Sequence, residues 1–192
     1  MRSILLALLA CAGIYFISCN SETTKTTASA EISNDSLVKK GHYLITILGC
    51  GDCHTPKLMT LRGPVPDTSR ILSGYREGTP LGKVSREAFA QGWALFNGEL
   101  TAMASPMGIS FSANLTSDET GIGTWTFDQF KTALTKGKWK GLENSRDLLP
   151  PMPWMNYVNM EESDMKALFA YLKSTKPIKN KVPDPVPADK ME

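Results

Sequence analysis

Histidine and cysteine are scarce in this 192-residue sequence, which contains only 2 His and 4 Cys. So few soft ligands argue against a disulfide-stapled scaffold and against a multi-histidine metal cluster. A strong charge of one sign is also lacking, since 21 Lys and Arg and 19 Asp and Glu leave a net charge of +2. Binding to a nucleic-acid backbone needs a stronger positive field. Any metal chemistry must therefore depend on very few residues.

No apolar run is long enough to span a bilayer comfortably, because the longest, at residues 4–17, has about 14 residues against the ~20 of a membrane helix. It follows Arg2 and has the pattern of a secretory signal. Its end, Phe16-Ile17-Ser18-Cys19, resembles a bacterial lipoprotein signal. We expect a signal peptide at residues 1–18 and a lipidated Cys19, with an uncleaved N-terminal anchor as the alternative. Either places the protein on the periplasmic or cell-surface side of a membrane.

The composition divides the rest of the chain into three parts. Residues 19–35 contain no aromatic residue and predict a flexible tether. Residues 177–192 contain four prolines and predict an extended tail. Between them, residues 36–176 show no internal repeat and predict one folded domain. The hydrophobic fraction of 42% is ordinary for a soluble domain and excludes a polytopic membrane protein.

Helical periodicity dominates this domain and predicts an all-α fold. Apolar residues spaced for one helix face occur over residues 36–48 and 164–174, and Gly41 permits the two helices to cross closely. A third helix is predicted from the capping box at Thr126 to Gly137. A fourth is predicted over residues 85–98. Strand-like alternation is rare.

The motif Cys50-Gly51-Asp52-Cys53-His54 carries the predicted chemistry. Cys-x-x-Cys-His is the attachment signature of c-type haem. Two thiols on one helical turn can each add to a vinyl group of the porphyrin, and the adjacent His reaches the iron. The motif therefore predicts one covalent haem c, with thioethers at Cys50 and Cys53 and His54 as proximal ligand. A redox-active thiol pair, half of a zinc site and a plain disulfide are the alternatives.

A sixth ligand is needed if the iron only transfers electrons. The best placed methionine is Met152, because Pro151 and Pro153 stiffen the loop that presents it. Met155 is the second choice. His42, the other histidine, precedes the motif on what we expect to be the same helix, so it would have to cross to the other face of the ring. We therefore predict Met152 as the distal metal ligand.

Taken together, these motifs resemble a class I cytochrome c domain over residues 37–182. The resemblance rests on the haem motif followed by Thr-Pro and on residues 112–116, 120–126, 149–154 and 167–172. By this pattern the chain is similar to monohaem subunits of membrane-associated dehydrogenase systems and to lipoproteins of Bacteroidetes-type bacteria. The resemblance implies the cytochrome c fold, with crossed N- and C-terminal helices around one haem. It also implies that Trp125 and Trp154 lie near the haem edge or propionates.

The interval at residues 55–111 is longer than a minimal cytochrome c needs, and we interpret it as a long loop insertion that covers the haem edge or docks a partner. The predicted function is non-enzymatic transfer of single electrons from a dehydrogenase- or quinol-linked donor to an oxidase or another acceptor. A haem-based enzyme or gas or peroxide sensor with a labile sixth ligand is the alternative. Lys136, Lys138 and Lys140 form either a docking patch or, as we favour, a solvated loop.

Overall fold

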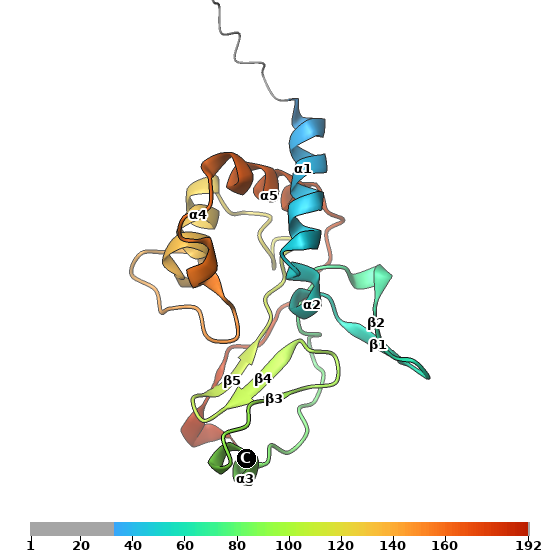
Figure 1. Cartoon of the computed structure of the whole chain (residues 1–192), viewed down its shortest axis with the longest axis vertical. Coiled ribbons are helices and arrows are strands. Elements are labelled where there is room, and N and C mark those ends of the chain that lie inside the picture. Colours follow the sequence, from blue (N-terminus) through green and yellow to red (C-terminus); the bar gives the residue numbers. More distant parts are fainter. Residues whose placement is uncertain (1–32, 192) are drawn as a thin grey trace, which may run out of the picture. The chain divides into compact units, whose positions relative to one another are not determined.

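Two helices from opposite ends of the domain pack against each other (Figure 1). The computed structural model describes residues 33–191. Helix α1 (Asn34–Ile47) packs against helix α5 (Glu162–Ser174), and a Cβ atom on Gly41 would collide with the backbone oxygen of Ala167. The predicted helices and their close crossing at Gly41 are therefore present. The proposed signal peptide, Cys19 and nearly all of the tether lie outside the described residues.

The third predicted helix, α4 (Phe127–Lys136), has the expected ends. The Thr126 hydroxyl accepts a hydrogen bond from the Gln129 amide at 3.2 Å, and the Gln129 side chain accepts one from the Thr126 amide at 2.9 Å. Gly137 ends the helix in the left-handed conformation, with φ of 63°. Phe130 on the buried face lies against Phe169 of α5, with 5.4 Å between ring centroids. The helix thus joins the core that α1 and α5 share. That core contains the buried residues Leu44, Ile45, Leu72, Ile122, Phe130, Met165, Ala167, Leu168 and Leu172.

The first helix does not continue into the Cys-x-x-Cys-His motif, which corrects the expectation of one continuous helix. Helix α1 ends at Ile47, and Gly49 adopts a left-handed φ of 66°. A separate short helix, α2 (Cys50–His54), then carries the motif. The glycine turns the chain, so the motif has an orientation of its own relative to α1.

The prediction of an all-α fold is wrong, because the described chain also contains two antiparallel sheets. A hairpin is formed by β1 (Lys57–Thr60) and β2 (Gly63–Pro66). The second sheet has the strand order β3-β4-β5-β6. Its strands are β3 (Leu95–Phe96), β4 (Ala102–Ser105), β5 (Gly108–Phe111) and β6 (Val186–Pro187). Most strands lie in the interval interpreted as a loop insertion, where pairing satisfies backbone groups that a loop would leave to solvent.

The helix predicted over residues 85–98 is also mostly wrong. Only α3 (Arg86–Ala90) forms there, capped by the Ser85 hydroxyl. Gly92, with φ of 88°, follows the helix end. Leu95 and Phe96 then pair with β4 as strand β3. Their spacing resembles a helix face, but pairing with β4 determines their conformation.

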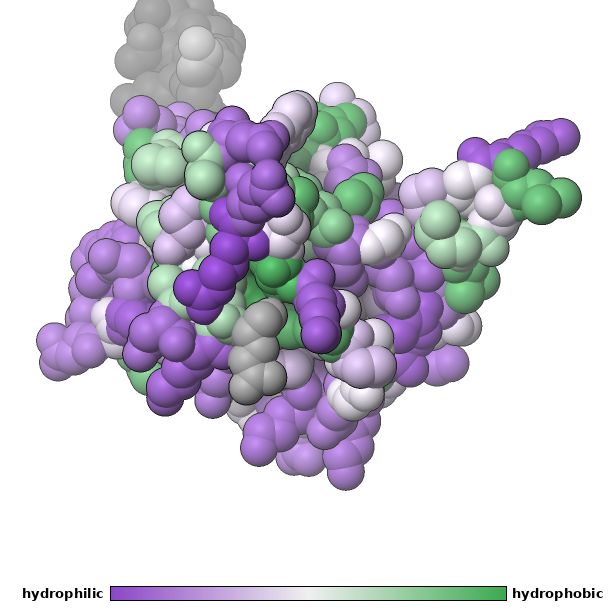
Figure 2. Space-filling view, turned by 90° about the horizontal axis from the view of Figure 1, so that it is seen from below, coloured by the Kyte–Doolittle hydropathy of each residue, from purple (hydrophilic) through white to green (hydrophobic). Residues whose placement is uncertain are grey.

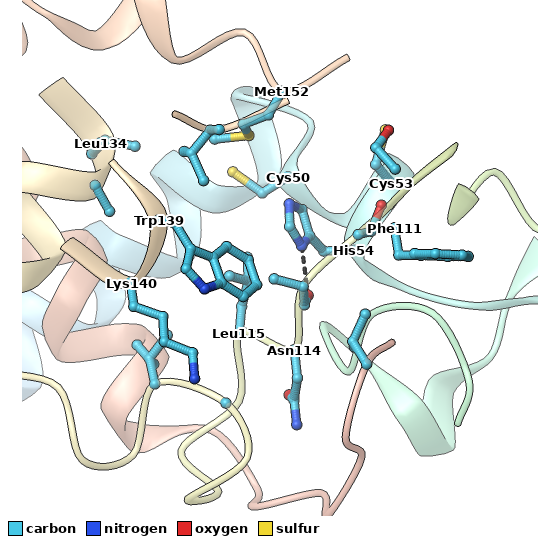
Figure 3. A pocket seen from close by; sticks show the side chains of 18 of the residues that line it. Cys50, Cys53, His54, Phe111, Asn114, Leu115, Leu134, Trp139, Lys140 and Met152 are labelled. Carbon is cyan, nitrogen blue, oxygen red and sulfur yellow. Dashed lines mark hydrogen bonds between the residues drawn. The ribbon is translucent and has the colours of Figure 1, made fainter. Parts of the chain in front are cut away.

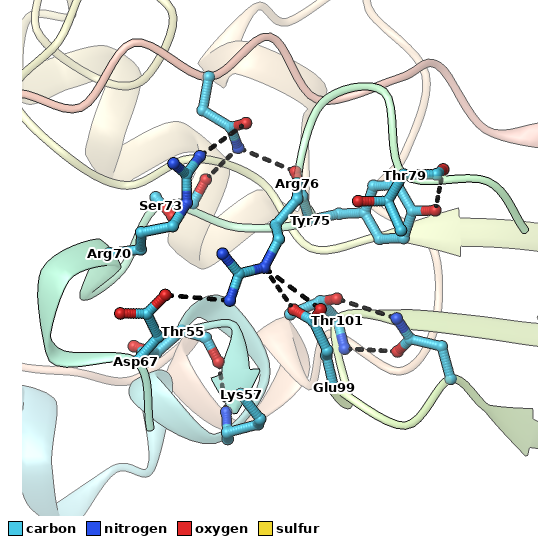
Figure 4. A network of polar contacts seen from close by, with 12 residues as sticks. Thr55, Lys57, Asp67, Arg70, Ser73, Tyr75, Arg76, Thr79, Glu99 and Thr101 are labelled. Carbon is cyan, nitrogen blue, oxygen red and sulfur yellow. Dashed lines mark hydrogen bonds and ion pairs between the residues drawn. The ribbon is translucent and has the colours of Figure 1, made fainter. Parts of the chain in front are cut away.

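A partly buried network of ion pairs connects segments of the insertion at residues 55–111 (Figure 4). The Arg76 guanidinium contacts Asp67 at 3.0 Å and Glu99 at 3.0 Å. Asp67 follows the β1–β2 hairpin, whereas Glu99 lies in the loop between β3 and β4. Arg76 therefore ties the two sheets together through their connecting segments.

The proline-containing C-terminal segment packs along the domain. The buried Asn180 side chain donates to the backbone oxygens of Ser73 at 2.6 Å and Tyr75 at 2.8 Å, and accepts from the Glu77 amide at 2.9 Å. Farther on, β6 pairs with β5, and Met191 is buried against the second sheet. Residues 177–191 thus pack against the domain and contribute buried residues to it.

The β1–β2 hairpin projects from the body of the molecule and carries apolar residues on its surface (Figure 2). The exposed side chains are Leu58, Met59, Leu61 and Val65. Among residues 33–191, no helix has the length and apolar character required to cross a membrane.

Candidate functional site

A large, mostly apolar cavity brings the predicted site residues together. Its volume is about 740 Å³, within the ~300–1,000 Å³ usual for small-molecule and cofactor sites. Helices α2, α4 and α5 contribute to its wall, as do β4, β5 and the C-terminal segment. The four predicted cofactor-binding residues all line it: Cys50, Cys53, His54 and Met152. Figure 3 shows them around one space.

Helix α2 places both thiols at the cavity. Cys50 and Cys53 are free, half-buried and separated by a single turn. Burial raises the pKa of the Cys50 thiol to about 11, and burial also raises the pKa of Cys53. Both sulfurs are therefore held as neutral thiols at neutral pH. In the described residues, no group of three or more His, Cys, Asp and Glu side chains is arranged to hold a metal ion.

His54 is fixed by a hydrogen bond to the backbone. Its Nδ1 lies 2.8 Å from the carbonyl oxygen of Ala113, and because a carbonyl only accepts, Nδ1 is the donor. Burial lowers the pKa of the ring. A neutral imidazole with its proton on Nδ1 leaves an Nε2 lone pair free to bind a metal. In Figure 3 the ring nitrogen that makes no hydrogen bond points away from Ala113, into the cavity.

The structure separates the two candidate methionines. Met152 lines the cavity and is half-buried. Met155 is 64% exposed and lies outside the lining. His42 is exposed on α1 and packs on Tyr171, with 5.1 Å between ring centroids, so it also lies outside the cavity. Among these three candidates, only Met152 lines the cavity.

The tryptophans near the cavity differ from those the resemblance implied. Trp125 does line it, whereas Trp154 packs over Gly137 and is absent from the lining. Trp139 takes a place in the wall, and the Arg146 guanidinium lies 4.2 Å from its ring centroid. This stacked pair puts a cation at the cavity wall.

The three lysines near Trp139 do not form a uniform patch. Lys136 pairs with Glu143 at 2.6 Å, and Lys138 pairs with Asp147 at 2.7 Å. Lys140 lines the cavity instead. Two of the three charges are thus compensated by neighbouring carboxylates.

Sequence reasoning missed several contributors to the site. The Ala113 carbonyl that orients His54, the Trp139–Arg146 pair and the buried Tyr157 were not identified as site residues. Burial is the main cause that raises the pKa of Tyr157, and the neighbouring Cys50 and Cys53 add to it. A backbone carbonyl carries no residue-type signal. Trp139 does carry a residue-type signal, because an aromatic residue stands between two lysines. The sequence does not show which way its ring faces.

The residues present fit a haem group. The volume and apolar lining suit a large flat macrocycle. Two free thiols and an imidazole with an available Nε2 form one wall, and a thioether is available from Met152. This donor set of one imidazole and one thioether is typical of c-type cytochromes.

Comparison with known proteins gives independent information, although no family model matches the chain. The gluconate 2-dehydrogenase cytochrome c subunit of Pantoea cypripedii is 33% identical over 140 residues, which is 72% of this chain and 23% of that protein. The cytochrome c subunit of the alcohol dehydrogenase (quinone) of Gluconobacter oxydans is 27% identical over 161 residues, 82% of this chain and 26% of that protein. The fructose dehydrogenase cytochrome subunit of Gluconobacter japonicus is 29% identical over 151 residues, 78% of this chain and 23% of that protein.

The chain spans about a quarter of the length of these relatives. The three alignments nevertheless cover between 72% and 82% of this chain. Their similarity and the cavity lined by the Cys-x-x-Cys-His motif support the same assignment. The chain is homologous to cytochrome c subunits of dehydrogenases, which supports a cytochrome c domain.

Proposed function

We propose that this chain is an exported, membrane-tethered monohaem c-type cytochrome that carries single electrons between a respiratory or dehydrogenase donor and a downstream acceptor. The observation that carries the proposal is the shared cavity of Cys50, Cys53, His54 and Met152. The homology to cytochrome c subunits supports the electron-transfer role.

The roles of the residues follow from their chemistry. The Cys50 and Cys53 thiols would each hold the haem through one thioether, formed by addition of the S–H group across a vinyl double bond, which would need no oxidant or reductant. His54, which the Ala113 carbonyl holds in position, would bind the iron through Nε2. Met152, from its proline-flanked loop, would offer its thioether sulfur as the other ligand of the iron. The bound haem supplies an iron that gains or loses one electron.

The arrangement favours electron transfer over the enzyme or sensor alternative. Electron carriers keep both axial positions filled, whereas enzymes and gas sensors leave one open for a substrate. His42, the histidine that does not belong to the haem motif, lies outside the cavity and therefore supplies no acid/base group there. We therefore propose a non-catalytic role for this chain.

The proposed donor is a dehydrogenase, because three of the matched relatives are named as cytochrome subunits of dehydrogenases. The sequence contains one Cys-x-x-Cys-His motif, so we propose one haem and one electron per cycle. An oxidase or another exported carrier would accept the electron.

Membrane tethering rests on the sequence around Cys19, which lies outside the described residues. Cys19→Ala should block lipoprotein processing and change membrane retention. Cys11→Ala is the matched control and should alter neither. Unchanged processing in the Cys19 variant would favour an uncleaved anchor.

The central test is the mass of the purified chain, measured after denaturation. One covalent haem should add its mass to the polypeptide, and the reduced protein should show the spectrum of a six-coordinate low-spin c-type haem. A chain that carries two hydrogens fewer and no added group would instead indicate a Cys50–Cys53 disulfide and overturn the proposal.

A further inference from the structure

Lys57 is a buried cation that contacts the backbone of the Cys-x-x-Cys-His turn. It is 8% exposed although it lies in strand β1 of the projecting hairpin. Its Nζ donates to the carbonyl oxygens of Gly51 at 3.2 Å and Asp52 at 2.9 Å, and also to that of Thr55. Figure 4 shows the contact with Thr55. An ammonium group has three donors, so these three carbonyls satisfy all of its hydrogen-bonding capacity.

The carbonyls that Lys57 holds belong to the haem motif and its immediate continuation. Gly51 and Asp52 are the two residues between the cysteines, and Thr55 follows His54. Helix α2 has only 5 residues, so few of its carbonyls find partners within it. Gly51 accepts from the Thr55 amide at 3.1 Å, and His54 accepts from the Gly74 amide at 2.7 Å. Lys57 supplies a further anchor and fixes the residues between the two thiols.

The charge of Lys57 is not cancelled by a direct ion pair. Among residues 33–191, no carboxylate oxygen lies within 4.0 Å of its Nζ. Burial is the main cause that lowers the pKa of Lys57, and the charges of Asp52, Cys53 and Glu99 oppose this effect. The carbonyls that its ammonium contacts belong to Gly51, Asp52 and Thr55, which are the direct sequence neighbours of Cys50, Cys53 and His54. The charge of Lys57 therefore lies beside the residues proposed to hold the haem.

We propose that Lys57 is a positioning residue for the haem site, whose hydrogen bonds fix the turn between the cysteines and whose charge favours the reduced iron. The proposal rests on the proposed function. Oxidation adds one positive charge to the haem, and a nearby cation in a poorly solvated site opposes that addition. Net charge close to a haem or cluster is one of the factors that set its reduction potential. Lys57 should accordingly raise the potential.

The experiment compares reduction potential and haem attachment in four variants of the full chain. Lys57→Met removes charge and hydrogen bonds, Lys57→Gln removes the charge and keeps donors, and Lys57→Arg keeps the charge. Lys173→Met is the matched control, because Lys173 also donates to a backbone carbonyl, that of Gly123, but on α5. Each protein is examined by mass spectrometry after denaturation and by a potentiometric titration of the haem spectrum.

We expect both neutral variants to have a lower potential, with the equilibrium constant for reduction decreased on the order of tenfold. Lys57→Arg and Lys173→Met should keep the wild-type potential. Attachment should be least complete in Lys57→Met. A wild-type potential in either neutral variant overturns the proposal.

If neither Lys57→Met nor Lys57→Gln attaches haem, their potentials cannot be measured, and Lys57→Arg becomes the test of the proposal. If Lys57→Arg attaches haem and keeps the wild-type potential, the result supports a role for the positive charge at position 57. If none of the three Lys57 variants attaches haem, the proposal is overturned, because packing of the lysine side chain would then explain its importance. Wild-type protein without covalent haem would instead refute the proposed function itself.

Discussion

Met152 lines the cavity that contains His54, whereas Met155 lies outside it and is 64% exposed. The two residues are close in the sequence, but Met152 precedes Pro153, whereas Met155 belongs to the short turn Trp154–Tyr157. Their different positions make them a natural pair for testing the sixth ligand.

Met152→Ala should open the iron to exogenous ligands and lower the reduction potential, because a thioether ligand favours the reduced iron. Met155→Ala should leave the axial spectrum unchanged. Carbon monoxide binding to the reduced protein, followed spectroscopically at neutral pH, measures the effect. Strong carbon monoxide binding by the wild type would favour the enzyme or sensor alternative. A change only in the Met155 variant would transfer the ligand assignment to that residue.

The two cysteines should contribute separately to attachment, since each thioether needs its own thiol. Cys50→Ala and Cys53→Ala should each leave a singly attached and poorly matured haem, and the double variant should carry no covalent haem. Mass spectrometry after denaturation distinguishes these states. Covalent haem in the double variant would show that the motif has been misread.

Arg76 should stabilise the folded insertion, because its guanidinium is the charge partner of the buried Asp67. Removing one member of a partly buried ion pair leaves the other charge buried without a partner. We therefore expect Arg76→Met to lower the free energy of unfolding by about 2 kcal/mol. Lys136→Met breaks an exposed pair with Glu143 and should cost less than about 1 kcal/mol. Denaturant unfolding gives both values. Equal effects would contradict a special role for Arg76.

Glu162 should make stability depend on pH in the acid range. Hydrogen bonds from Lys131 and Lys166, together with their charges, lower the pKa of this carboxyl from 4.5 to about 2. A lowered folded-state pKa means that the ion pairs stabilise the protein above about pH 4.5 and are lost as the pH falls toward about 2. Glu162→Gln should therefore slightly lower the Tm at pH 7 and have no effect at the acid end.

The control for this prediction is Glu161→Gln, which removes a neighbouring carboxylate that forms no ion pair within the described residues. Thermal unfolding is measured for each variant across the acid range and at two salt concentrations. Because the pairs are exposed, salt should reduce the difference between wild type and the Glu162 variant. A difference that persists below pH 2 would count against the ion pairs as its cause.

Helices α1, α4 and α5 were predictable because their signals are local. The capping box at Thr126, the glycine at position 137 and the apolar spacing of residues 36–48 each act within one helix. The residues that line the cavity were partly predictable for the same reason, since Cys50 to His54 form a contiguous motif and prolines flank Met152. Whether these residues hold haem stays a prediction.

Strand β6 was not predictable because it is short and its pairing partner is distant in the sequence. Strand β6 has only 2 residues, and its partner β5 lies far back in the chain. Two residues are too few to establish an alternating pattern. The carbonyl of Ala113 was equally hidden, because any residue type supplies a backbone oxygen and only the folded chain brings it 2.8 Å from His54.

Asn180 closes contacts with Ser73 and Tyr75 across more than half of the sequence. Contacts between such distant residues require closure of a long loop, which costs chain entropy. We therefore expect these contacts to form late in folding. The nearby Lys181 and Val182 also form part of the cavity wall. This segment thus completes a wall around the haem-binding motif, which lies far earlier in the sequence. We therefore expect the cavity to be more open to solvent when this segment is undocked than when it is in place.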